Sequence, residues 1–206
     1  MKCKNNIVIL LLILIVFVAV AIGWFLESPF VSNNARISAV TALKNRLGSI
    51  PKKGTLIIVD FSKPSQTKRL AVMNLETGKI LFYARVAHGQ NSGSVYALKL
   101  SNTIGSRQSS AGLFSVAGSF NGKHGASLRL IGLDSHLNGN AEKRGIIIHS
   151  AKYVSLRSII ANWKEKFRLG RSNGCFVLSN DDFQKLNENL VRPAYLYSKA
   201  YEGKMR

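Results

Sequence analysis

Cys175 is the side chain of this sequence best suited to covalent chemistry, and it ends the turn-like segment Arg171-Ser172-Asn173-Gly174-Cys175. The other cysteine, Cys3, precedes a long apolar segment, so no disulfide between the two is expected. A thiol attacks as thiolate and, with an ordinary pKa of about 8.5, needs help near neutral pH. His149 follows directly on the apolar run 145–148 and is the histidine nearest to Cys175 along the chain. The pair predicts nucleophilic acyl transfer.

The residues beside this pair have roles of their own in such a reaction. A histidine partner must be held in one tautomer by an acceptor on its other nitrogen. Gly174 lets the backbone approach the nucleophile closely, and the amides of Gly174 and Cys175 are predicted to face a developing oxyanion. The imidazole serves either as a base or as the cationic partner of a thiolate, and the sequence leaves both open.

A run of strands must position these groups. Apolar and β-branched segments separated by turn residues predict a mostly β domain of the sandwich or barrel type, with a few short helices. One helix is expected over 158–167, with Ile159, Ile160 and Trp163 on one face, and another is capped by 180–182, with Phe183, Leu186 and Leu190 inward. The predicted strands cover 55–61, 69–74, 79–87, 113–117, 127–132, 145–149, 175–178 and 194–198.

One long segment lacks such a pattern. Residues 88–112 are rich in Gly, Ser and Asn and contain few large apolar residues. A connection of this length is uncommon within a compact domain, so the segment is predicted to be a functional or lid-like loop.

The N-terminus carries a different signal. The segment from Ile7 to Leu26 contains no charged residue and no proline, and it is preceded by Lys2 and Lys4. Its length is enough for a helix to cross a bilayer, and the lysines would keep the N-terminus in the cytoplasm. The alternative is a signal peptide cleaved near 19–21. Either way, the domain is expected in the cell envelope, on the periplasmic side of the inner membrane or free in the periplasm.

Three parts of the chain follow from these signals. Residues 1–28 form the anchor or signal peptide, and residues 54–201 form the catalytic domain. Residues 29–53 form a helical connector in which Ile37, Val40, Leu43 and Leu47 recur at helical spacing.

The chain is strongly basic, with a formal charge of +19. Residues 27–206 carry +17 of it, because the segment before Glu27 holds Lys2 and Lys4 and no acid. For an exported domain we expect no nucleic-acid partner. The anionic partners at hand are lipid headgroups and envelope polymers, and the alternative is that the charge only keeps the protein soluble.

The site segments resemble a known family. His149-Ser150 followed by Ser172-Asn173-Gly174-Cys175 is similar to the active-site signature of murein L,D-transpeptidase catalytic domains of the YkuD type, in the branch found in Gram-negative envelopes. The resemblance covers about residues 54–200. It extends to 59–65, 86–93, 101–103, 122–125 and 128–130.

The resemblance implies a catalytic assignment. Cys175 is the nucleophile, His149 the general base and acid, the Ser150 carbonyl orients the imidazole, and the Gly174 and Cys175 amides form the oxyanion hole. It implies no metal and no organic cofactor. Four further residues are expected to bind substrate: Ser172, Arg171, Asn173 and His124.

It also implies a substrate. The cysteine attacks the third residue of a peptidoglycan stem peptide, expels the terminal D-alanine and passes the acyl group to an amine of a second stem, giving a 3→3 cross-link. The implied fold is a β-sandwich or barrel, in agreement with the predicted strands.

The chain departs from the family pattern in two places. Asn173 stands where the common signature has histidine, and the segment between His149 and Ser172 is longer than usual. The extra part either reshapes an acceptor site or is a surface helix. Arg171 either binds a substrate carboxylate or pins its own loop.

Three other functions remain for comparison. The same Cys-His site could deliver the thioester to water, as an L,D-carboxypeptidase or amidase. The domain could instead be a non-catalytic tether between membrane and wall. A serine acyltransferase is disfavoured, because the Ser-x-x-Lys matches at 49–52 and 65–68 contain a proline or lead into a predicted strand.

Overall fold

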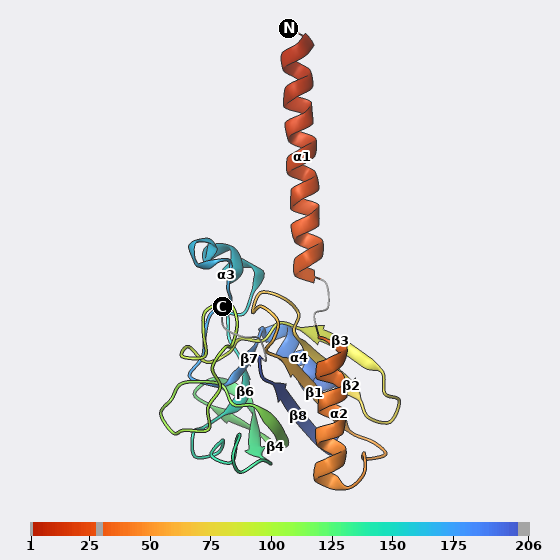
Figure 1. Ribbon diagram of the computed structural model, residues 1–206, viewed down its shortest axis with the longest axis vertical. Helices are drawn as coiled ribbons and strands as arrows, with labels where there is room; N and C mark the ends of the chain where they lie inside the picture. Colours follow the sequence, from red (N-terminus) through yellow and green to blue (C-terminus); the bar gives the residue numbers. More distant parts are fainter. Residues whose placement is uncertain (1, 28–30, 202–206) are drawn as a thin grey trace.

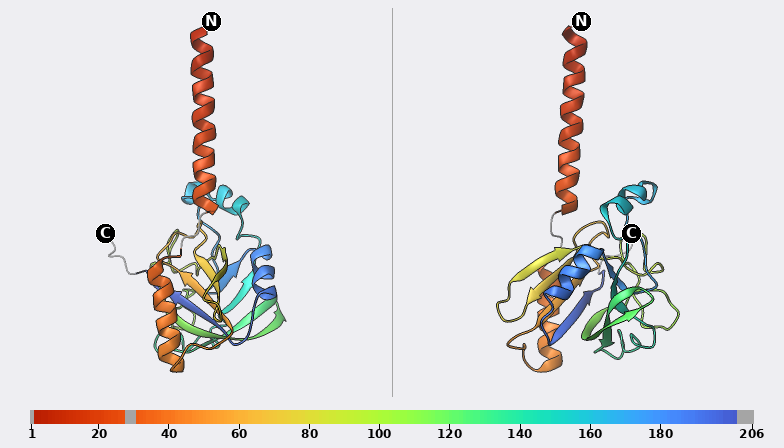
Figure 2. Two further views of the ribbon diagram at one scale, coloured as in Figure 1. Left: turned by 90° about the vertical axis from the view of Figure 1, so that its right-hand side faces the viewer. Right: turned by 180° about the vertical axis from the view of Figure 1, so that it is seen from behind.

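The computed structural model describes residues 2–27 and 31–201 and shows a mainly β domain (Figure 1). Eight strands form one sheet in the order β3-β2-β1-β8-β4-β5-β6-β7, which curves into a barrel-like shape (Figure 2). The expected fold class is therefore confirmed for the domain. The strands are β1 Thr55–Asp60, β2 Leu70–Asn74, β3 Ile80–Ala84, β4 Gly112–Gly122, β5 Gly125–Gly132, β6 Ile147–Ser150, β7 Phe176–Leu178 and β8 Ala194–Lys199.

Two strand pairs of this sheet are parallel. β1 pairs with β8 in parallel, with Ile57 opposite Leu196, and β6 pairs with β7 in parallel, with Ile148 opposite Phe176. The remaining pairs are antiparallel. Both parallel pairs need crossover connections, because a tight turn can join only antiparallel strands. The β6–β7 crossover carries the helical segments α3 Leu156–Ala161 and η1 Trp163–Glu165.

Helix α2, Asn33–Leu47, packs on the outer face of the sheet beside β1 and β8. The Ser32 hydroxyl caps it by accepting from the Ala35 amide at 3.1 Å, and Gly48 ends it with a φ of 78°. Its buried line is Ala35, Ala39 and Leu43, at i, i+4 and i+8.

The predicted apolar face of this helix is only partly correct. Leu43 is buried, but Ile37 is 64% exposed and Leu47 is 41% exposed. Two alanines let the helix backbone lie close to the sheet, which favours the line through Ala35 and Ala39. At about 100° per residue, Ile37 lies roughly 200° from Ala35 and therefore faces outward.

The second expected amphipathic helix is α4, Asn180–Glu188. The Ser179 hydroxyl caps it by accepting from the Asp182 amide at 3.1 Å. Phe183 and Leu186 are buried against the main core and Leu190 packs against it, as predicted.

Helix α1, Lys2–Glu27, projects away from the domain (Figure 1). Its apolar side chains from Ile9 to Trp24 are exposed. Within the residues that the structure describes, no helix meets the length and apolarity needed to cross a membrane. The expectation of a membrane-spanning anchor is thus unsupported, and the boundary between the predicted 1–28 and 29–53 segments lies outside the described residues.

A buried carboxylate joins α2 to the sheet. Asp60, at the end of β1, has no exposed surface. Its Oδ2 accepts from the Ser32 amide at 3.0 Å and the Ser32 hydroxyl at 2.7 Å, and its Oδ1 accepts from the Ser62 amide at 3.1 Å and hydroxyl at 2.5 Å. One side chain therefore fixes both the start of α2 and the turn after β1.

Asp60→Asn should destabilise the domain. An amide offers one acceptor oxygen where two are used, and its NH2 group would face donors, so we expect a loss of about 1–3 kcal/mol in the free energy of unfolding. Urea denaturation at pH 7 measures this loss. The control is Glu76→Gln at an exposed turn, which should change stability by less than about 0.5 kcal/mol; equal effects would contradict the role given to Asp60.

Candidate active site

A cavity of about 590 Å³ lies where β5, β6 and the segment before β7 meet. It holds both residues of the predicted catalytic pair and all four of the predicted substrate-binding residues. Its lining is Phe120, Gly122, Lys123, His124, Ser127, Arg144, Gly145, Ile147, His149, Ala151, Tyr153, Arg171, Ser172, Asn173 and Cys175.

The parallel pairing of β6 and β7 brings the pair to one cavity. His149 is the third residue of β6 and lies opposite Val177, while Cys175 immediately precedes β7. On its other side, β6 pairs with β5, which places Ser127 opposite His149. Because strand pairing fixes register, both side chains stand on rigid elements.

His149 is held in a single tautomer. Its Nδ1 lies 3.0 Å from the Ser150 carbonyl oxygen. A carbonyl only accepts, so Nδ1 carries the proton and Nε2 keeps its lone pair. Burial, and then the charges of His124 and Lys123, hold the pKa of His149 below its ordinary value, although the bond to Ser150 opposes the shift. The imidazole is therefore neutral at neutral pH and able to accept a proton.

Cys175 is a free cysteine that is partly buried. Its Sγ lies 3.5 Å from the Gly145 carbonyl oxygen. Burial raises the pKa of the thiol, while a hydrogen bond from the Ile147 backbone and the charges of Lys123 and Arg144 act in the opposite direction. The resting pair is thus a thiol beside a neutral imidazole, which favours the base over the ion-pair alternative.

The turn before Cys175 is closed by Ser172. Its hydroxyl donates to the Cys175 carbonyl at 2.7 Å and accepts from the Gly174 amide at 3.1 Å. The Gly174 N–H is therefore already engaged, which departs from its expected place in an oxyanion hole. Gly174 has a φ of 121°, and a Cβ there would lie 2.7 Å from the Gln108 carbonyl oxygen, so glycine is required.

Arg171 and Asn173 contact the loop that lies behind the turn. Arg171 donates to the carbonyls of Gln90 at 3.1 Å and Gly93 at 3.2 Å, which corresponds to the loop-pinning alternative. Asn173 Oδ1 accepts from Gln90 Nε2 at 3.2 Å. Asn173 thus occupies the family's histidine position with a bond to the protein itself.

His124 lies directly against His149. Their rings stack with centroids 4.2 Å apart and planes 16° from parallel. Since β5 follows the turn that carries His124, the β4–β5 hairpin places this ring over the predicted base. The position agrees with a role at the cavity wall, and binding of substrate by His124 remains a prediction.

The 88–112 loop supports the site from behind. Ser109 is fully buried, accepts from the Gly89 amide at 3.0 Å and donates to the Gly174 carbonyl at 3.3 Å. His88 is 1% exposed and bridges the Arg69 guanidinium, at 2.8 Å, and the Gly93 carbonyl, at 3.1 Å. No residue of this loop lines the cavity. The loop therefore contacts the site from behind, and a lid-like role stays a prediction.

Buried charge explains how this loop is held. Arg69 has no exposed surface and also donates to the Val86 carbonyl through Nε at 3.1 Å. Desolvation lowers the pKa of Arg69 to about 9, while Asp60 opposes the shift. Desolvation, and then the charge of Arg69, lower the pKa of His88 to about 3. His88 is thus a neutral structural residue, as expected of a loop histidine.

Arg144 ties the same loop to the cavity wall, and no motif in the sequence marked it. Its guanidinium donates to the carbonyls of Ser101 and Gln108 and to the hydroxyls of Ser110 and Ser106, the last at 3.1 Å. Gln108 is the residue whose carbonyl packs against Gly174. Arg144 therefore fixes the backbone behind the turn before Cys175 while lining the cavity.

Tyr153 is a second residue whose place the sequence did not indicate. Its side chain lines the cavity. Burial and the charge of a Cys175 thiolate raise the pKa of Tyr153 to about 12, so the phenol stays protonated. Gly170 accommodates the ring, because a Cβ there would lie 2.5 Å from Tyr153 Cδ2.

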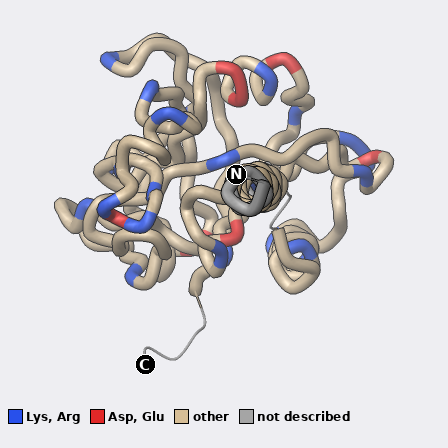
Figure 3. Tube along the Cα trace, turned by 90° about the horizontal axis from the view of Figure 1, so that it is seen from above, with Lys and Arg blue, Asp and Glu red and all other residues tan. Residues whose placement is uncertain are grey.

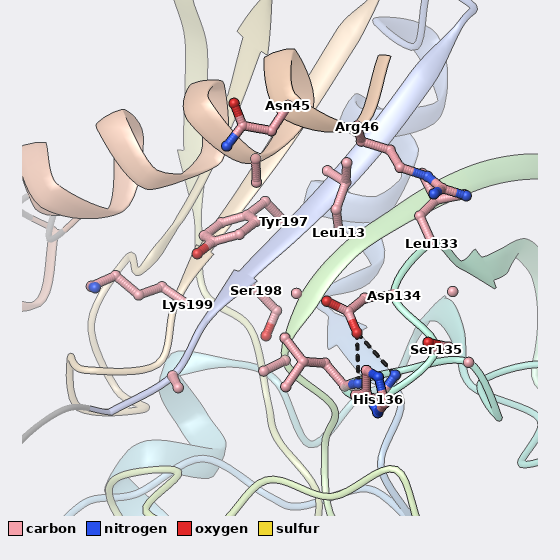
Figure 4. Close-up of a pocket in the computed structure, with 17 residues that line it drawn as sticks. Asn45, Arg46, Leu113, Leu133, Asp134, Ser135, His136, Tyr197, Ser198 and Lys199 are labelled. Carbon is pink, nitrogen blue, oxygen red and sulfur yellow. Dashed lines mark hydrogen bonds between the residues drawn. The ribbon is translucent and has the colours of Figure 1, made fainter. Parts of the chain in front are cut away.

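A larger cavity of about 900 Å³ lies elsewhere, between α2, the ends of β4 and β8, and the turn after β5 (Figure 4). It contains no cysteine, and Asp134 at its wall accepts from the His136 and Leu137 amides, both at 3.0 Å. Its carboxylate thus organises a turn. Across the described residues, no group of three or more His, Cys, Asp or Glu is placed to hold a metal ion.

The pH dependence of thiol alkylation tests the resting state of the pair. In a Cys3→Ser background, the rate of iodoacetamide modification of Cys175 should rise with pH and reach half its maximum above about pH 8.5, because burial raises the thiol pKa. A plateau of fast alkylation between pH 5 and 7 that His149→Ala abolishes would instead indicate a thiolate–imidazolium pair.

Arg144→Lys should slow acylation by about ten- to a hundred-fold, because one ammonium cannot replace a guanidinium bonded to four groups. A thermal melt and the rate of Cys175 acylation measure the effect. Arg129→Lys, at an outward-facing β5 position, is the matched control and should retain activity; equal losses would remove the special role of Arg144.

The comparisons with known proteins agree with the fold. A family model described as the L,D-transpeptidase catalytic domain matches residues 28–199. No curated protein matches the chain. Among solved structures, an L,D-transpeptidase from Mycobacterium smegmatis shares 12% identity at a TM-score of 0.43, with 72% of this chain and 59% of that chain covered.

A mutant of the helical cell shape determining protein Pgp2 from Campylobacter jejuni shares 14% identity at a TM-score of 0.51, with 84% of this chain and 58% of that chain covered. The chain therefore spans less than two thirds of the length of either solved structure. At 14% identity the likeness to Pgp2 concerns the fold alone. The family match extends over most of the chain, and this protein belongs to the L,D-transpeptidase catalytic domain family.

Proposed function

We propose that this protein is a cysteine-dependent peptidoglycan L,D-transpeptidase. The single observation that carries the proposal is the cavity that holds a free Cys175 and a neutral His149 whose Nδ1 is fixed by the Ser150 carbonyl. A nucleophile and its base must act at one site, and both side chains line this cavity. The family match supplies the substrate class, peptidoglycan stem peptides.

In the first half-reaction, His149 Nε2 takes the thiol proton as Cys175 Sγ attacks the carbonyl of the third residue of a tetrapeptide stem. The carbon becomes tetrahedral and its oxygen takes up negative charge. The C–N bond then breaks, and the D-alanine amine leaves with the proton held by His149. A thioester on Cys175 remains. This sequence suits an imidazole whose pKa lies below its ordinary value, because the proton is returned readily.

In the second half-reaction, an amine of another stem peptide attacks the thioester. His149 takes a proton from the amine and returns it to the departing sulfur, which restores the thiol. The product carries a 3→3 cross-link. Water as the acceptor would give a tripeptide instead, which is the outcome of a carboxypeptidase.

The oxyanion is assigned to the Cys175 amide. The Gly174 amide, the other expected donor, is bonded to Ser172 Oγ at 3.1 Å. The Gly174 carbonyl lies in the same peptide plane as the Cys175 amide and accepts from the Ser109 hydroxyl at 3.3 Å, so Ser109 holds the plane that this amide must present. Donors that are fixed before charge develops stabilise a transition state most effectively.

The charge of the cavity fits an anionic donor. Lys123, Arg144 and Arg171 lie in its wall, and no Asp or Glu does. A stem peptide carries carboxylates at its terminal D-alanine and on a diaminopimelate side chain. Basic residues are therefore suited to draw the donor to the thiol.

We place this activity in the cell envelope, where such a substrate resides. Lysine and arginine positions are spread over many segments of the trace, and positions of aspartate and glutamate are few (Figure 3). This distribution supports an association with anionic envelope polymers. The N-terminal segment is either a retained or a cleaved export signal in this proposal.

The decisive experiment is intact-protein mass spectrometry after incubation with a disaccharide-tetrapeptide, followed by analysis of the products. We expect a thioester on Cys175, release of D-alanine and a 3→3 dimer. Cys175→Ser and His149→Ala should each lower the acylation rate by about a thousand-fold or more without unfolding the domain.

The matched control is His136→Ala, because His136 is an exposed histidine of the turn after β5, outside the cavity. It should keep the wild-type rate. Full turnover in the Cys175→Ser variant would refute the proposed nucleophile. An adduct that yields only tripeptide would assign the protein as a carboxypeptidase, and absence of adduct and product would favour the tether.

A further inference from the structure

The crossover between β6 and β7 ends in an exposed tip that the proposed reaction does not use. The tip consists of α3, η1 and residues 166–167, which stand out from the domain (Figures 1 and 2). It was expected to be one helix with Ile159, Ile160 and Trp163 on a common face. The structure instead breaks the helix at Asn162, buries Ile159 and leaves Ile160 and Trp163 exposed.

Only Ile159 of that set faces inward. It is 1% exposed and packs in a small cluster with Val154, Leu169, Ala87 and Val177. This anchor fixes the base of the tip to the domain. The large apolar side chains outside the anchor are Leu156, Ile160, Trp163 and Phe167, with exposed fractions of 44%, 65%, 61% and 50%.

The shape of the tip is held by its own backbone. The Asn162 carbonyl accepts from the amides of Glu165 at 2.9 Å and Phe167 at 3.1 Å, and Asn162 Nδ2 donates to the Arg168 carbonyl at 3.1 Å. Lys166 and Phe167 have φ values of 57° and 55°. Two consecutive non-glycine residues with a left-handed φ are uncommon, and this turn ends on the half-exposed Phe167.

The tip is also basic. The segment 152–168 contains a single acid, Glu165, among the basic residues Lys152, Arg157, Lys164, Lys166 and Arg168. Glu165 is bonded to Arg168 through its Oε2, at 2.6 Å from Nε. Lys164 lies over the Trp163 ring at 5.4 Å from its centroid. Exposed apolar and aromatic side chains with a fringe of lysine and arginine are the composition that binds an anionic lipid interface.

We propose that this tip docks the domain on an anionic lipid surface, with Trp163, Ile160 and Phe167 at the level of the headgroups. The composition of the tip supports this partner, because its exposed apolar side chains stand beside Lys164 and Lys166, and an anionic lipid surface offers both an apolar layer and negative charge. The tip lies at the same end of the domain as α1 (Figures 1 and 2). The base of the tip reaches the candidate site through Tyr153, so docking would also set the orientation of the cavity toward the lipid surface.

Trp163 offers a direct readout. The chain has two tryptophans, Trp24 and Trp163, so the full-length Trp24→Phe variant reports on the tip alone, whatever α1 does. Its emission is recorded with phosphatidylglycerol vesicles and with phosphatidylcholine vesicles, each with and without bromine-labelled acyl chains. We expect a blue shift and bromine quenching with phosphatidylglycerol and neither with phosphatidylcholine.

A charge variant tests the basic fringe. Adding Lys164→Gln and Lys166→Gln should raise the lipid concentration needed for half of the emission shift by roughly thirty-fold. Each lost charge is expected to weaken binding by about five-fold. The matched control is Lys52→Gln with Lys53→Gln, which removes two exposed lysines that follow α2.

Each other result would overturn the proposal. Unchanged Trp163 emission would show that the tip does not meet lipid, and equal shifts with both lipids would leave the basic fringe without a role. A shift that grows with protein concentration in the absence of vesicles would identify a second copy as the partner. Turnover of a soluble muropeptide should be unaffected by the lysine variants, so this inference and the proposed function are tested separately.

Discussion

The parallel pairing of β6 and β7 is the constraint on which the candidate site depends. It sets Ile148 opposite Phe176 and so brings the end of one strand and the start of the next to a single cavity. Parallel neighbours cannot be joined by a tight turn. The long segment between His149 and Cys175 is therefore the crossover that this geometry demands, and its length allows both the nucleophile turn and the apolar tip to be built into one connection.

Burial of polar groups, rather than apolar packing alone, orders the loops around this pair. Asp60 gathers four donors from the start of α2 and the turn after β1. Arg69 lies behind the 88–112 loop and His88 begins it, and every polar side-chain nitrogen of both residues is bonded to a protein group. Buried groups of this kind are costly unless fully bonded, so each of them specifies one loop conformation. The nucleophile turn rests on that conformation through Ser109 and Gln108.

Strands and capped helices of this chain were predictable from local patterns. The turn residues and apolar runs located the strands to within a few residues, and Asn180-Asp181-Asp182 located α4. The buried face of a helix depends on tertiary contacts, and it was not predictable from local patterns. In α2 the close approach of Ala35 and Ala39 to the sheet outweighed the larger side chains of Ile37 and Leu47. In the crossover, the break at Asn162 separated side chains that an unbroken helix would have placed together.

The candidate site shows the same division. Cys175, His149 and the serine that closes the nucleophile turn follow from the signature, because those residue types do the chemistry themselves. The roles of Arg144 and Tyr153 depend on contacts with residues that are distant in the sequence. A single sequence does not indicate such contacts. The engagement of the Gly174 amide by Ser172 likewise depends on a hydroxyl rotamer that spacing does not encode.

The hydrogen bonds of Arg144 also affect how the sequence of the 88–112 loop can diverge among related proteins. Two of its acceptors are main-chain carbonyls, those of Ser101 and Gln108, and every residue type provides a carbonyl. Side-chain replacements at these two positions would therefore leave those contacts in place. A deletion or insertion between residues 101 and 108 would move the carbonyls relative to one guanidinium. Divergence in this loop is thus expected to alter its composition more freely than its length.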